Sequence, residues 1–574
     1  MTFLKLFLFV LSSLGSFELL RLALKDGVNT YWLPSLTIAV QVTVLFFAGL
    51  LNLLPEAVWG LYLLGFGGLL CQCISYKKSS RRGTQLFLAE YLKPGYVVLL
   101  VVLGAATLYV RGKVFTHYDN FSHWALVVQQ MLMKDRFPNF RDTLIIFQEY
   151  PLGSASYIYF FAKLVGTEEP IQMLAQIYMI SAALLPLFTF VTKNKIFSSV
   201  GMLSFFYFAF VYNTFITELL VDTLLPVVGS CGLLFAVLYC KKGCGKATLW
   251  CSAFYMVQVI QIKNSGIFFA LLILFVILYR AEKGRNLFRC APSLLFPFLS
   301  LLLWQKHCKY VFPDAAASRH AMTAENYLST FSSKSTADLL KICSSFLKFA
   351  ISWKDIWIAA LFFAVLGCMI YVLGKNLWKC YRNIFLGSVL LYILYQLGML
   401  AMYLFSMPTA EALGLASSVR YSKTILIAIA YWNMIPALML ASEVSSSKAA
   451  ALLASACIPV SVCAFLFAAS GSLKPEAEFS PEKRLWMDAA VYEYAVPKYD
   501  TYCILCDQDS RDYYFYLAQY LLHSDAILSV SADDPNSKPI LNQYILVQDP
   551  EKEPVLDWVR TNFPDQVGRH VILQ

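Results

Sequence analysis

The chain has 574 residues, of which 59% are hydrophobic and 14% are charged, and its formal net charge is +10. Soluble domains contain about a quarter charged residues, so this composition excludes an ordinary soluble protein and indicates an integral membrane protein. The positive charge lies largely in short basic loops between apolar stretches, as expected for cytoplasmic loops. It therefore gives no support to nucleic-acid binding.

Apolar stretches long enough to cross a hydrocarbon core of about 30 Å recur throughout residues 1–470. They predict an all-α polytopic membrane domain of about fourteen transmembrane helices. The first has one early Lys and no small-x-small cleavage site before Arg21, so we interpret it as a span rather than a signal peptide. The predicted spans are 3–22, 33–52, 57–76, 94–111, 170–192, 197–214, 220–240, 247–262, 265–280, 290–306, 355–374, 384–405, 424–442 and 449–468.

Basic clusters predict how the chain is oriented. If the spans simply alternate, these clusters share one side, which the positive-inside tendency assigns to the cytoplasm. They are KKSSRR (77–82), KNK (193–195), KKGCGK (241–246), RAEKGR (280–285) and KNLWKCYR (375–382). Both termini are then expected outside the cytoplasm, together with the loops 112–169, 307–354 and 406–423.

The tail, residues 471–574, is richer in charged residues and proline and predicts a small extracytoplasmic α/β domain. Cys503 and Cys506 lie three apart in a predicted strand, so they should point to opposite faces, which disfavours a disulfide or a zinc pair. No Gly-rich phosphate loop or nucleophile motif occurs in the tail, which favours a structural or substrate-guiding role. Strands are predicted at 501–507, 526–531, 544–549 and 570–574, and helices near 511–523 and 553–563.

The segment HYDNFSHW (117–124) places Asp119 soon after a predicted span. Apolar residues then repeat at helical spacing through 121–132, which predicts a helix lying in the membrane interface. Such a helix would hold the acidic side chain at the depth of lipid headgroups. Downstream, the turn Tyr150-Pro151-Leu152-Gly153 leads into an aromatic stretch at 152–166, which we expect to be re-entrant or to lie on the surface.

An acidic residue after a span, an interfacial helix and a Tyr-Pro-x-Gly turn resemble the GT-C superfamily of membrane glycosyltransferases. The resemblance is strongest over 117–161 and is closest to bacterial GT-C-like proteins with an Asp-x-Phe-Ser-His-Trp motif. That motif is matched here by Asp119, Phe121, Ser122, His123 and Trp124. A looser likeness continues through LLVDTLLP (219–226), QIKNSGIFF (261–269) and EALGLASSVRYSK (411–423).

The resemblance implies a polyprenyl-phosphate-linked sugar as donor and a cell-envelope glycan or lipid-linked saccharide as acceptor. It also implies a multi-pass protein of the plasma (cytoplasmic) membrane whose active site faces outward, with an inverting displacement as the reaction. Where many superfamily members have two adjacent acidic residues, this chain has Asp119-Asn120. Since Asn is a weaker ligand than carboxylate for a hard cation, we expect no divalent metal and no cofactor.

Transfer from a lipid phosphate needs a base for the acceptor hydroxyl and cations for the departing phosphate. We predict Asp119 as the catalytic base, and Lys263, Arg420 and Lys423 as donor phosphate-binding residues. The competing interpretation of each charge is a helix cap or a side chain that snorkels to water. The predicted substrate-binding residues are His123, Trp124, Tyr150, Glu218, Asp222, Glu411 and Tyr421.

Two positions carry local arguments of their own. Lys263 breaks an apolar stretch at the predicted outer end of a span, where a cation is costly unless it is paired or functional. Glu218 and Asp222 are four residues apart, so a helix there would place both carboxylates on one face. The topology, derived only from basic loops and span counting, assigns all of these groups to the same side of the membrane.

Two other functions use similar residues. A transporter or flippase of a lipid-linked saccharide would also have many spans and membrane-depth charges, but should show charges near span midpoints and two similar halves. A polysaccharide polymerase or ligase would use the same outer face and the same cations. The sequence favours a glycosyltransferase whose partners are membrane lipid, the polyprenyl-phosphate sugar and a glycan acceptor.

Overall fold

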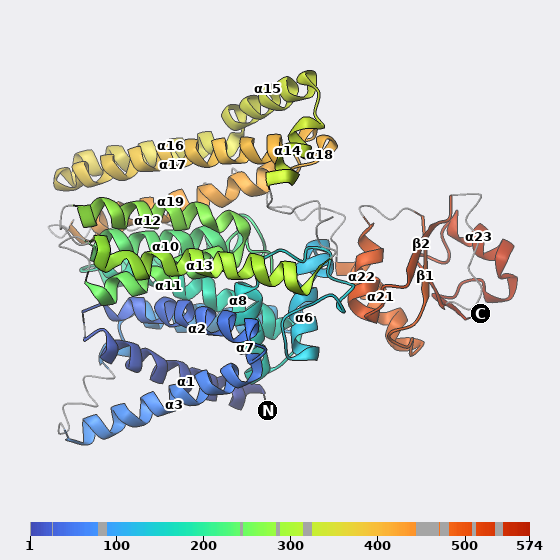
Figure 1. Ribbon diagram of the computed structural model, residues 1–574, viewed down its shortest axis with the longest axis horizontal. Coiled ribbons are helices and arrows are strands. Elements are labelled where there is room, and N and C mark those ends of the chain that lie inside the picture. Colours follow the sequence, from blue (N-terminus) through green and yellow to red (C-terminus); the bar gives the residue numbers. More distant parts are fainter. Residues whose placement is uncertain are drawn as a thin grey trace.

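The chain forms a bundle of helices with a small α/β domain at one end (Figure 1). It is represented by a computed structural model that describes residues 2–25, 27–78, 89–240, 245–282, 287–313, 324–443, 481–507, 512–533 and 544–573, with Leu466 and Ser470. The expected helical membrane protein with a C-terminal α/β domain is therefore confirmed at the level of architecture.

Within the described residues, seven helical segments are long and apolar enough to cross a membrane. These segments are Thr2–Ala23, Thr30–Leu50, Leu54–Ile74, Glu169–Phe190, Thr336–Leu373, Lys375–Phe405 and Ser418–Glu443. The first three contain α1 (Thr2–Ala23), η1 (Thr30–Trp32) with α2 (Leu33–Leu50), and most of α3 (Leu54–Lys78). The other four contain α8 (Glu169–Leu184) with η3 (Leu185–Phe190), α15 (Thr336–Ser352) with α16 (Lys354–Leu373), η6 (Lys375–Leu377) with α17 (Trp378–Phe405), and α19 (Ser418–Glu443). The prediction of fourteen full spans is therefore not met.

The difference arises because several predicted stretches form helices of only 16 or 17 residues, at 1.5 Å per residue shorter than a core of about 30 Å. These shorter apolar helices are Pro94–Val110 (α5), Lys195–Val211 (α9), Leu224–Tyr239 (α10) and Asn264–Arg280 (η4 with most of α12, Ile267–Glu282). The predicted stretches 247–262 and 290–306 lie in α11 (Lys246–Ile262) and α13 (Leu287–Val311), and 449–468 lies outside the described residues apart from Leu466.

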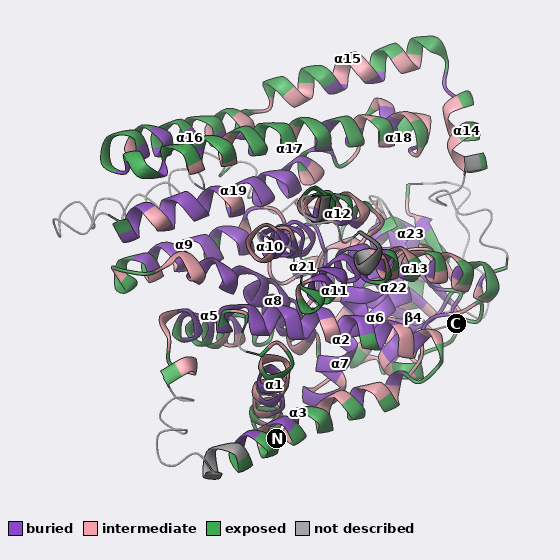
Figure 2. Cartoon of the chain, turned by 60° about the vertical axis from the view of Figure 1, so that its left-hand side comes forward, coloured by how far each residue is buried: buried purple, intermediate pink, exposed green. Residues whose placement is uncertain are grey.

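Burial separates the helices into a central group and a peripheral group (Figure 2). The central helices α8, α10, α11 and α19 bury most of their side chains, whereas α16 and α17 leave large apolar residues exposed, such as Leu361 on α16 and Leu390 on α17. Exposed apolar side chains on long helices are the pattern expected of a surface that faces lipid.

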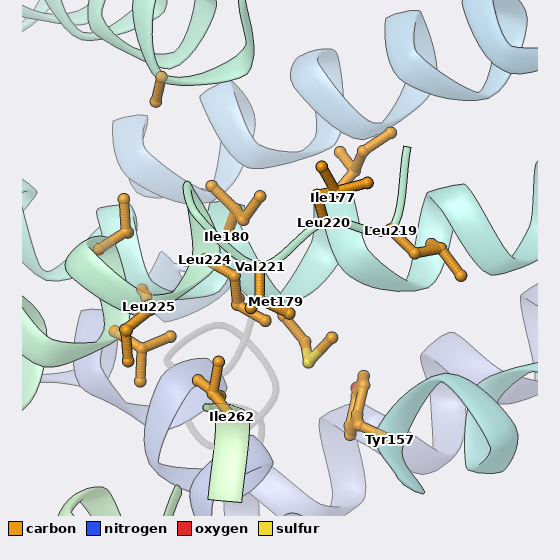
Figure 3. Close-up of a cluster of buried hydrophobic side chains, with 14 of the residues drawn as sticks. Tyr157, Ile177, Met179, Ile180, Leu219, Leu220, Val221, Leu224, Leu225 and Ile262 are labelled. Atoms are coloured by element: carbon orange, nitrogen blue, oxygen red, sulfur yellow. The ribbon is translucent and has the colours of Figure 1, made fainter. Parts of the chain in front are cut away.

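The central core continues up to the segment that links α9 to α10. Leu219, Leu220 and Val221 of that segment are buried and lie among side chains from α8 (Figure 3). Ile262 at the end of α11 and Tyr157 join the same cluster. Apolar packing therefore anchors the backbone of this link between its two carboxylate residues, Glu218 and Asp222.

The predicted surface segment at 152–166 is instead an internal helix, α7 (Gly153–Val165). All of its residues except Lys163 are buried, and it packs against α2, α8 and α11. The expectation of a surface segment was wrong, because its aromatic residues face neighbouring helices on all sides, whereas the alternative of a re-entrant segment stays a prediction. Hydropathy alone does not distinguish these two situations.

The segment predicted as one interfacial helix consists of a π-helical turn, Asn120–Trp124 (η2), followed by α6 (Ala125–Lys134). Its residues are buried on nearly every face, by α7 on one side and by the C-terminal domain on another. The apolar stripe of the sequence therefore packs largely against protein. Two short helices, α14 (Ala324–Ser332) and α18 (Thr409–Leu413), complete the same end of the bundle.

The C-terminal domain begins with α21 (Pro481–Glu493) and contains a four-stranded sheet of order β2-β1-β3-β4. The strand β1 (Tyr502–Cys506) pairs in parallel with β2 (Ile527–Ser531) and β3 (Tyr544–Val547), while β4 (Val571–Leu573) is antiparallel. The helices α22 (Tyr513–Leu522) and α23 (Val555–Asn562) match those predicted near 511–523 and 553–563. Cys503 and Cys506 are both buried in β1 and are not joined, as the strand spacing predicts.

Candidate functional site

Asp119 lies where the chain enters the helical region formed by η2 and α6. Residues 111–117 run without helix or strand from the end of α5, helical structure begins at Tyr118, and the backbone N–H of Asp119 donates to Nδ1 of His117 over 3.1 Å. The π-helical turn that follows widens the helix by one residue, and such turns occur frequently at functional sites. This geometry turns the Asp119 carboxylate toward the start of α19.

Four charged side chains meet there, and we call them the charge cluster: Asp119, Asp222, Lys263 and Arg420. Arg420 Nη1 is 2.5 Å from Asp119 Oδ2, although the two residues are 301 positions apart. Lys263 Nζ donates to Asp222 Oδ1 over 3.0 Å, and Arg420 Nε is 3.6 Å from Asp222 Oδ2. Two carboxylates and two cations therefore balance each other's charge.

Each member of the charge cluster comes from the end of an element. Asp222 precedes α10, Lys263 follows the last residue of α11, and Arg420 lies in the first turn of α19. Side chains at helix ends reach polar surroundings while the helix body stays in the apolar core. All four residues are site residues predicted from the sequence, but the sequence did not indicate which carboxylate pairs with which cation.

The pairing keeps the cluster ionised in spite of its burial. Burial by itself would raise the pKa of Asp119, but Arg420, His117 and hydrogen bonds from Arg420 and Tyr118 outweigh it and lower the pKa to about 2. Burial opposes the charged form of Asp222 and Lys263 as well, yet their mutual attraction lowers the pKa of Asp222 and raises that of Lys263. All of these groups are therefore charged at neutral pH.

The ring of Tyr421 lies beside both cations of the cluster, and the Nε–H of Arg420 makes no hydrogen bond with any described residue. Lys263 Nζ lies 4.9 Å from the centre of the Tyr421 ring, and the guanidinium of Arg420 lies 5.6 Å from it. The Nε–H of Arg420 is buried and has no hydrogen-bond partner among the described residues, because 3.6 Å is too long for one. This N–H therefore faces the Asp222 carboxylate as an ion pair without a hydrogen bond.

An aromatic group adjoins the charge cluster. The His123 ring lies 4.8 Å from Trp124 and 4.9 Å from Tyr150, measured between ring centres. Burial and the nearby Lys263 lower the pKa of His123 to about 3, with Asp119 opposing the shift, so the imidazole is neutral at physiological pH. Its Nδ1 is buried without a hydrogen-bond partner within the described part of the chain. We call His123, Trp124 and Tyr150 the aromatic wall; among its polar atoms, Nδ1 of His123 has no hydrogen-bond partner in the described residues.

Gly153 explains why the Tyr150–Gly153 turn lies so close to Lys263. A Cβ atom added at Gly153 would lie 2.7 Å from the carbonyl oxygen of Gln261, so only glycine permits this approach to the end of α11. The Gln261 side chain is fully buried, and neither its amide nitrogen nor its oxygen has a partner among the described residues. Gln261 was not predicted, since a glutamine in an apolar stretch shows no signal by spacing.

Glu218 occupies a different position from the one predicted, because no helix covers 218–222 and the two carboxylates do not share a helix face. Its carboxylate accepts from Thr116 Oγ1 over 2.6 Å, from the backbone N–H groups of Thr116 and His117 over 3.3 Å, and from the amide of Asn120. Asn120 Oδ1 in turn accepts from Leu219 N over 3.1 Å. Glu218 and Asn120 therefore anchor the backbone on both sides of Asp119.

Glu218 makes the stability of the protein depend on pH. Burial, assisted by Glu169, raises its pKa to about 7, although hydrogen bonds from Thr116 and His117 act in the opposite direction. An unfolded Glu titrates near about 4.3, so the folded state binds the proton more tightly, and this stabilisation is lost as pH rises through about 7. We expect the wild type to lose on the order of 3 kcal/mol relative to Glu218→Gln between about pH 4 and pH 8.

The measurement is the thermal unfolding midpoint of both proteins in nanodiscs over that pH range. The wild-type midpoint should fall toward high pH relative to the Glu218→Gln midpoint, because only the wild type must bury an ionised carboxylate at this position. Parallel curves for the two proteins would contradict the assignment of the titration to Glu218.

Lys423 and Glu411 lie apart from the charge cluster. Lys423 follows Arg420 on α19, but its Nζ lies 5.2 Å from the ring of Tyr212, whose hydroxyl donates to Asp355 over 2.9 Å. Glu411 is half-buried on α18, and no hydrogen bond or ion pair joins its carboxylate to the cluster within the described residues. The predicted roles of Lys423 in binding the donor phosphate and of Glu411 in binding substrate stay predictions.

Comparison of the chain with protein-family models, with curated proteins and with solved structures finds no match. The likeness to GT-C glycosyltransferases therefore depends on the residues of the chain, above all on Asp119 and the segment around it. The described residues contain no group of three or more His, Cys, Asp or Glu side chains arranged to hold a metal ion. The cations that adjoin Asp119 and Asp222 are those of Arg420 and Lys263.

Proposed function

We propose that this chain is a membrane glycosyltransferase that moves a sugar from a polyprenyl-phosphate-linked donor to a glycan or a lipid-linked acceptor. The observation that supports it most is the charge cluster, in which two carboxylates and two cations lie together at one end of a bundle of membrane helices. A base and phosphate-binding cations are the groups that this reaction requires. The basic loops predict that this end faces outward.

The donor phosphate is expected to bind between Arg420 and Lys263. The guanidinium has an Nε–H that makes no hydrogen bond among the described residues and lies 3.6 Å from Asp222 Oδ2, and it offers a planar fork that suits phosphate oxygens. The ammonium group of Lys263 supplies a second charge from the end of α11, 3.0 Å from Asp222. Both cations lie over the ring of Tyr421, which fills the space beneath them.

In the transfer step, the acceptor oxygen forms a bond to the anomeric carbon while the bond from that carbon to the phosphate oxygen breaks. The electron pair of the broken bond stays on the phosphate, where Arg420 and Lys263 stabilise the charge. The hydroxyl proton of the acceptor moves to Asp119. The anomeric configuration inverts, because the acceptor attacks the face opposite to the phosphate.

The ion pair between Asp119 and Arg420 makes this base weak before the donor binds, because a carboxylate whose pKa is about 2 has little affinity for a proton. A donor phosphate competes with the Asp119 carboxylate for the same guanidinium. When the phosphate takes hydrogen bonds from Arg420, the attraction that lowers the pKa of Asp119 is partly neutralised, and the pKa rises toward its usual range. Donor binding thus increases the basicity of Asp119.

The aromatic wall suits a sugar ring next to the phosphate. Trp124 and Tyr150 present apolar ring surface, and the neutral imidazole of His123 has a buried Nδ1 without a partner among the described residues. A sugar combines apolar C–H faces with hydroxyl groups, so it matches both features. We assign the wall to the transferred sugar, and Asp222 to holding Lys263 in place.

The rival functions predict different arrangements of charge. A transporter or flippase would be expected to hold its charges near the middle of spans, whereas Asp222, Lys263 and Arg420 lie at the ends of elements. A polymerase or ligase would use the same base and cations and would differ in the length of the donor saccharide. The length of the donor saccharide is therefore varied in the test.

The test is a transfer assay with the purified full-length protein in nanodiscs. The donors are radiolabelled polyprenyl-phosphate monosaccharides and lipid-linked oligosaccharides, and the acceptors are extracted envelope lipids and glycans. Movement of single labelled sugars supports the proposal, and movement of whole oligosaccharides only would support a polymerase or ligase. If no label moves, yet reconstituted vesicles carry a lipid-linked saccharide across the bilayer, the proposal is wrong and a transporter takes its place.

A further inference from the structure

The C-terminal domain contacts the membrane domain next to the segment that carries Asp119. In Figure 1 the helices α21 and α22 lie between the sheet and the end of the helix bundle, near α6. Arg484 of α21 is buried there, and its Nη2 donates to Glu169 Oε1 over 3.0 Å. The other oxygen of Glu169, at the start of α8, accepts from the backbone N–H of Phe115 over 2.6 Å. A buried ion pair between the domains thus holds the backbone four residues before Asp119.

Two tyrosines of α22 strengthen the same contact. Tyr520 Oη donates to Glu169 Oε1 over 3.0 Å, and Tyr513 Oη donates to the carbonyl oxygen of Thr116 over 3.0 Å. The ring of Phe121, two residues after Asp119, lies 5.8 Å from Tyr513 and 5.4 Å from Tyr520 between ring centres. The domain therefore contacts the chain on both sides of Asp119.

The guanidinium of Arg484 links the polar and aromatic parts of this contact. It lies 5.4 Å from the centre of the Phe121 ring and 5.4 Å from that of Tyr520. Asp488 on the next turn of α21 accepts from its Nε over 2.8 Å, so several of its donors are used. Burial of an Arg in this way is costly unless all its interactions form together, so the interface has one preferred arrangement.

Residues 115–121 are thus held from two directions. On one side, Glu218 of the membrane domain accepts hydrogen bonds from Thr116 and His117. On the other side, Tyr513 of the C-terminal domain donates to Thr116, while Arg484 and Tyr520 bind Glu169, the acceptor for the Phe115 N–H. We infer that the C-terminal domain is a positioning element of the site: it fixes residues 115–121 so that the Asp119 carboxylate faces Arg420. The reactive groups themselves all belong to the membrane domain.

Two physical arguments support a positioning role over simple attachment. The segment 112–117 between α5 and the helical region forms no helix or strand, and its local backbone hydrogen bonds include only turn bonds such as Lys113 N–H to Val110 O over 2.9 Å, so its order depends largely on partners from elsewhere. Displacement of a reacting group by about 1 Å costs of order 100-fold in rate. The contacts of Arg484 and Tyr513 fall on that segment, and much of the sheet lies away from it.

The first experiment measures the order of the segment directly and needs no transfer activity. We compare hydrogen exchange of the amides of Phe115, Thr116 and His117 in full-length protein in nanodiscs. Arg484→Gln should accelerate this exchange by about tenfold or more, and Tyr513→Phe, which loses only the hydroxyl, by a few-fold. The matched control is Arg560→Gln in the same domain, whose side chain is exposed and pairs only with Glu553 and Asp557 among the described residues.

The second experiment tests the consequence for the site and rests on the proposed function. Arg484→Gln and Tyr513→Phe should lower kcat for sugar transfer by about tenfold or more and by a few-fold, respectively, while the donor KM stays within about twofold. Arg484→Lys, which keeps the ion pair with Glu169, should restore part of kcat. A role in attachment alone would lower the amount of folded protein but leave kcat per folded molecule unchanged.

The two readouts separate failure of this inference from failure of the proposed function. Unchanged exchange at residues 115–117 in Arg484→Gln and in Tyr513→Phe would overturn the inference, whatever the activity. Faster exchange in a protein whose wild type transfers no sugar would support the positioning of this segment and refute the glycosyltransferase proposal. If Arg484→Gln fails to fold, hydrogen exchange at residues 115–117 in the Tyr513→Phe variant decides whether the inference holds.

Discussion

Replacement of Asp119 by Asn is expected to abolish sugar transfer while the donor binds as tightly as before or more tightly. The amide has nearly the shape of the carboxylate but does not accept a proton at neutral pH, and loss of a general base lowers kcat by about 100-fold to 10,000-fold. The same change removes the competitor of the donor phosphate for Arg420, which is 2.5 Å from the carboxylate. Lower kcat together with unchanged or lower donor Kd is the expected result.

The measurement combines single-turnover transfer with equilibrium binding of a polyprenyl phosphate in nanodiscs. Asp557→Asn is the matched control, because Asp557 is exposed in the C-terminal domain and should leave both quantities at the wild-type value. Transfer by Asp119→Asn within about threefold of the wild type would refute the assignment of the base. Weaker donor binding in this variant would refute the competition between the carboxylate and the phosphate.

Replacement of Arg420 by Gln is expected to weaken both the donor site and the fold. Arg420 is the cation shared by Asp119 and Asp222, so its removal leaves two partly buried carboxylates with Lys263 alone. Removal of one partner of a buried ion pair costs about 3–5 kcal/mol, and loss of a bidentate phosphate contact should raise the donor KM by about 100-fold. The measurements are the unfolding midpoint and the donor KM.

The double variant Asp119→Asn/Arg420→Gln separates the two effects of Arg420. It removes the unpaired carboxylate together with the cation, so it should recover much of the lost stability without recovering either kcat or KM. Arg560→Gln, whose guanidinium is exposed, is the control for loss of an arginine as such. A donor KM close to the wild-type value in Arg420→Gln would contradict a role in phosphate binding.

The sequence pointed to the members of the charge cluster by their positions relative to the predicted spans. Lys263 interrupts an apolar stretch, Asp222 and Asp119 lie close to predicted span ends, and Arg420 lies in a polar stretch between spans. A cation inside an apolar stretch is costly, so Lys263 stands out without any knowledge of the fold. The pairing within the cluster was not predictable, because Asp119 and Arg420 are 301 residues apart and meet only through helix packing.

The sequence-based predictions that were wrong also failed because they concern contacts made only after the helices pack. Hydropathy identified the apolar stretches that became helices, yet it did not predict that α5, α9 and α10 have only 16 or 17 residues. It also did not show that α7 is buried on all sides, because the sequence of an internal helix resembles that of a lipid-facing one. Glu218 was expected to contact substrate, but its carboxylate accepts hydrogen bonds from the protein backbone.

By itself, the sequence determined that this is a helical membrane protein with a C-terminal α/β domain, since both conclusions depend on composition and on short periodic patterns. It also identified the residue types at the candidate site. Only the tertiary structure decided that Arg420 pairs with Asp119, that Glu218 anchors the chain beside it, and that Arg484 reaches the same segment from the other domain. These contacts depend on the directions in which distant side chains project after the helices pack, and no local pattern encodes those directions.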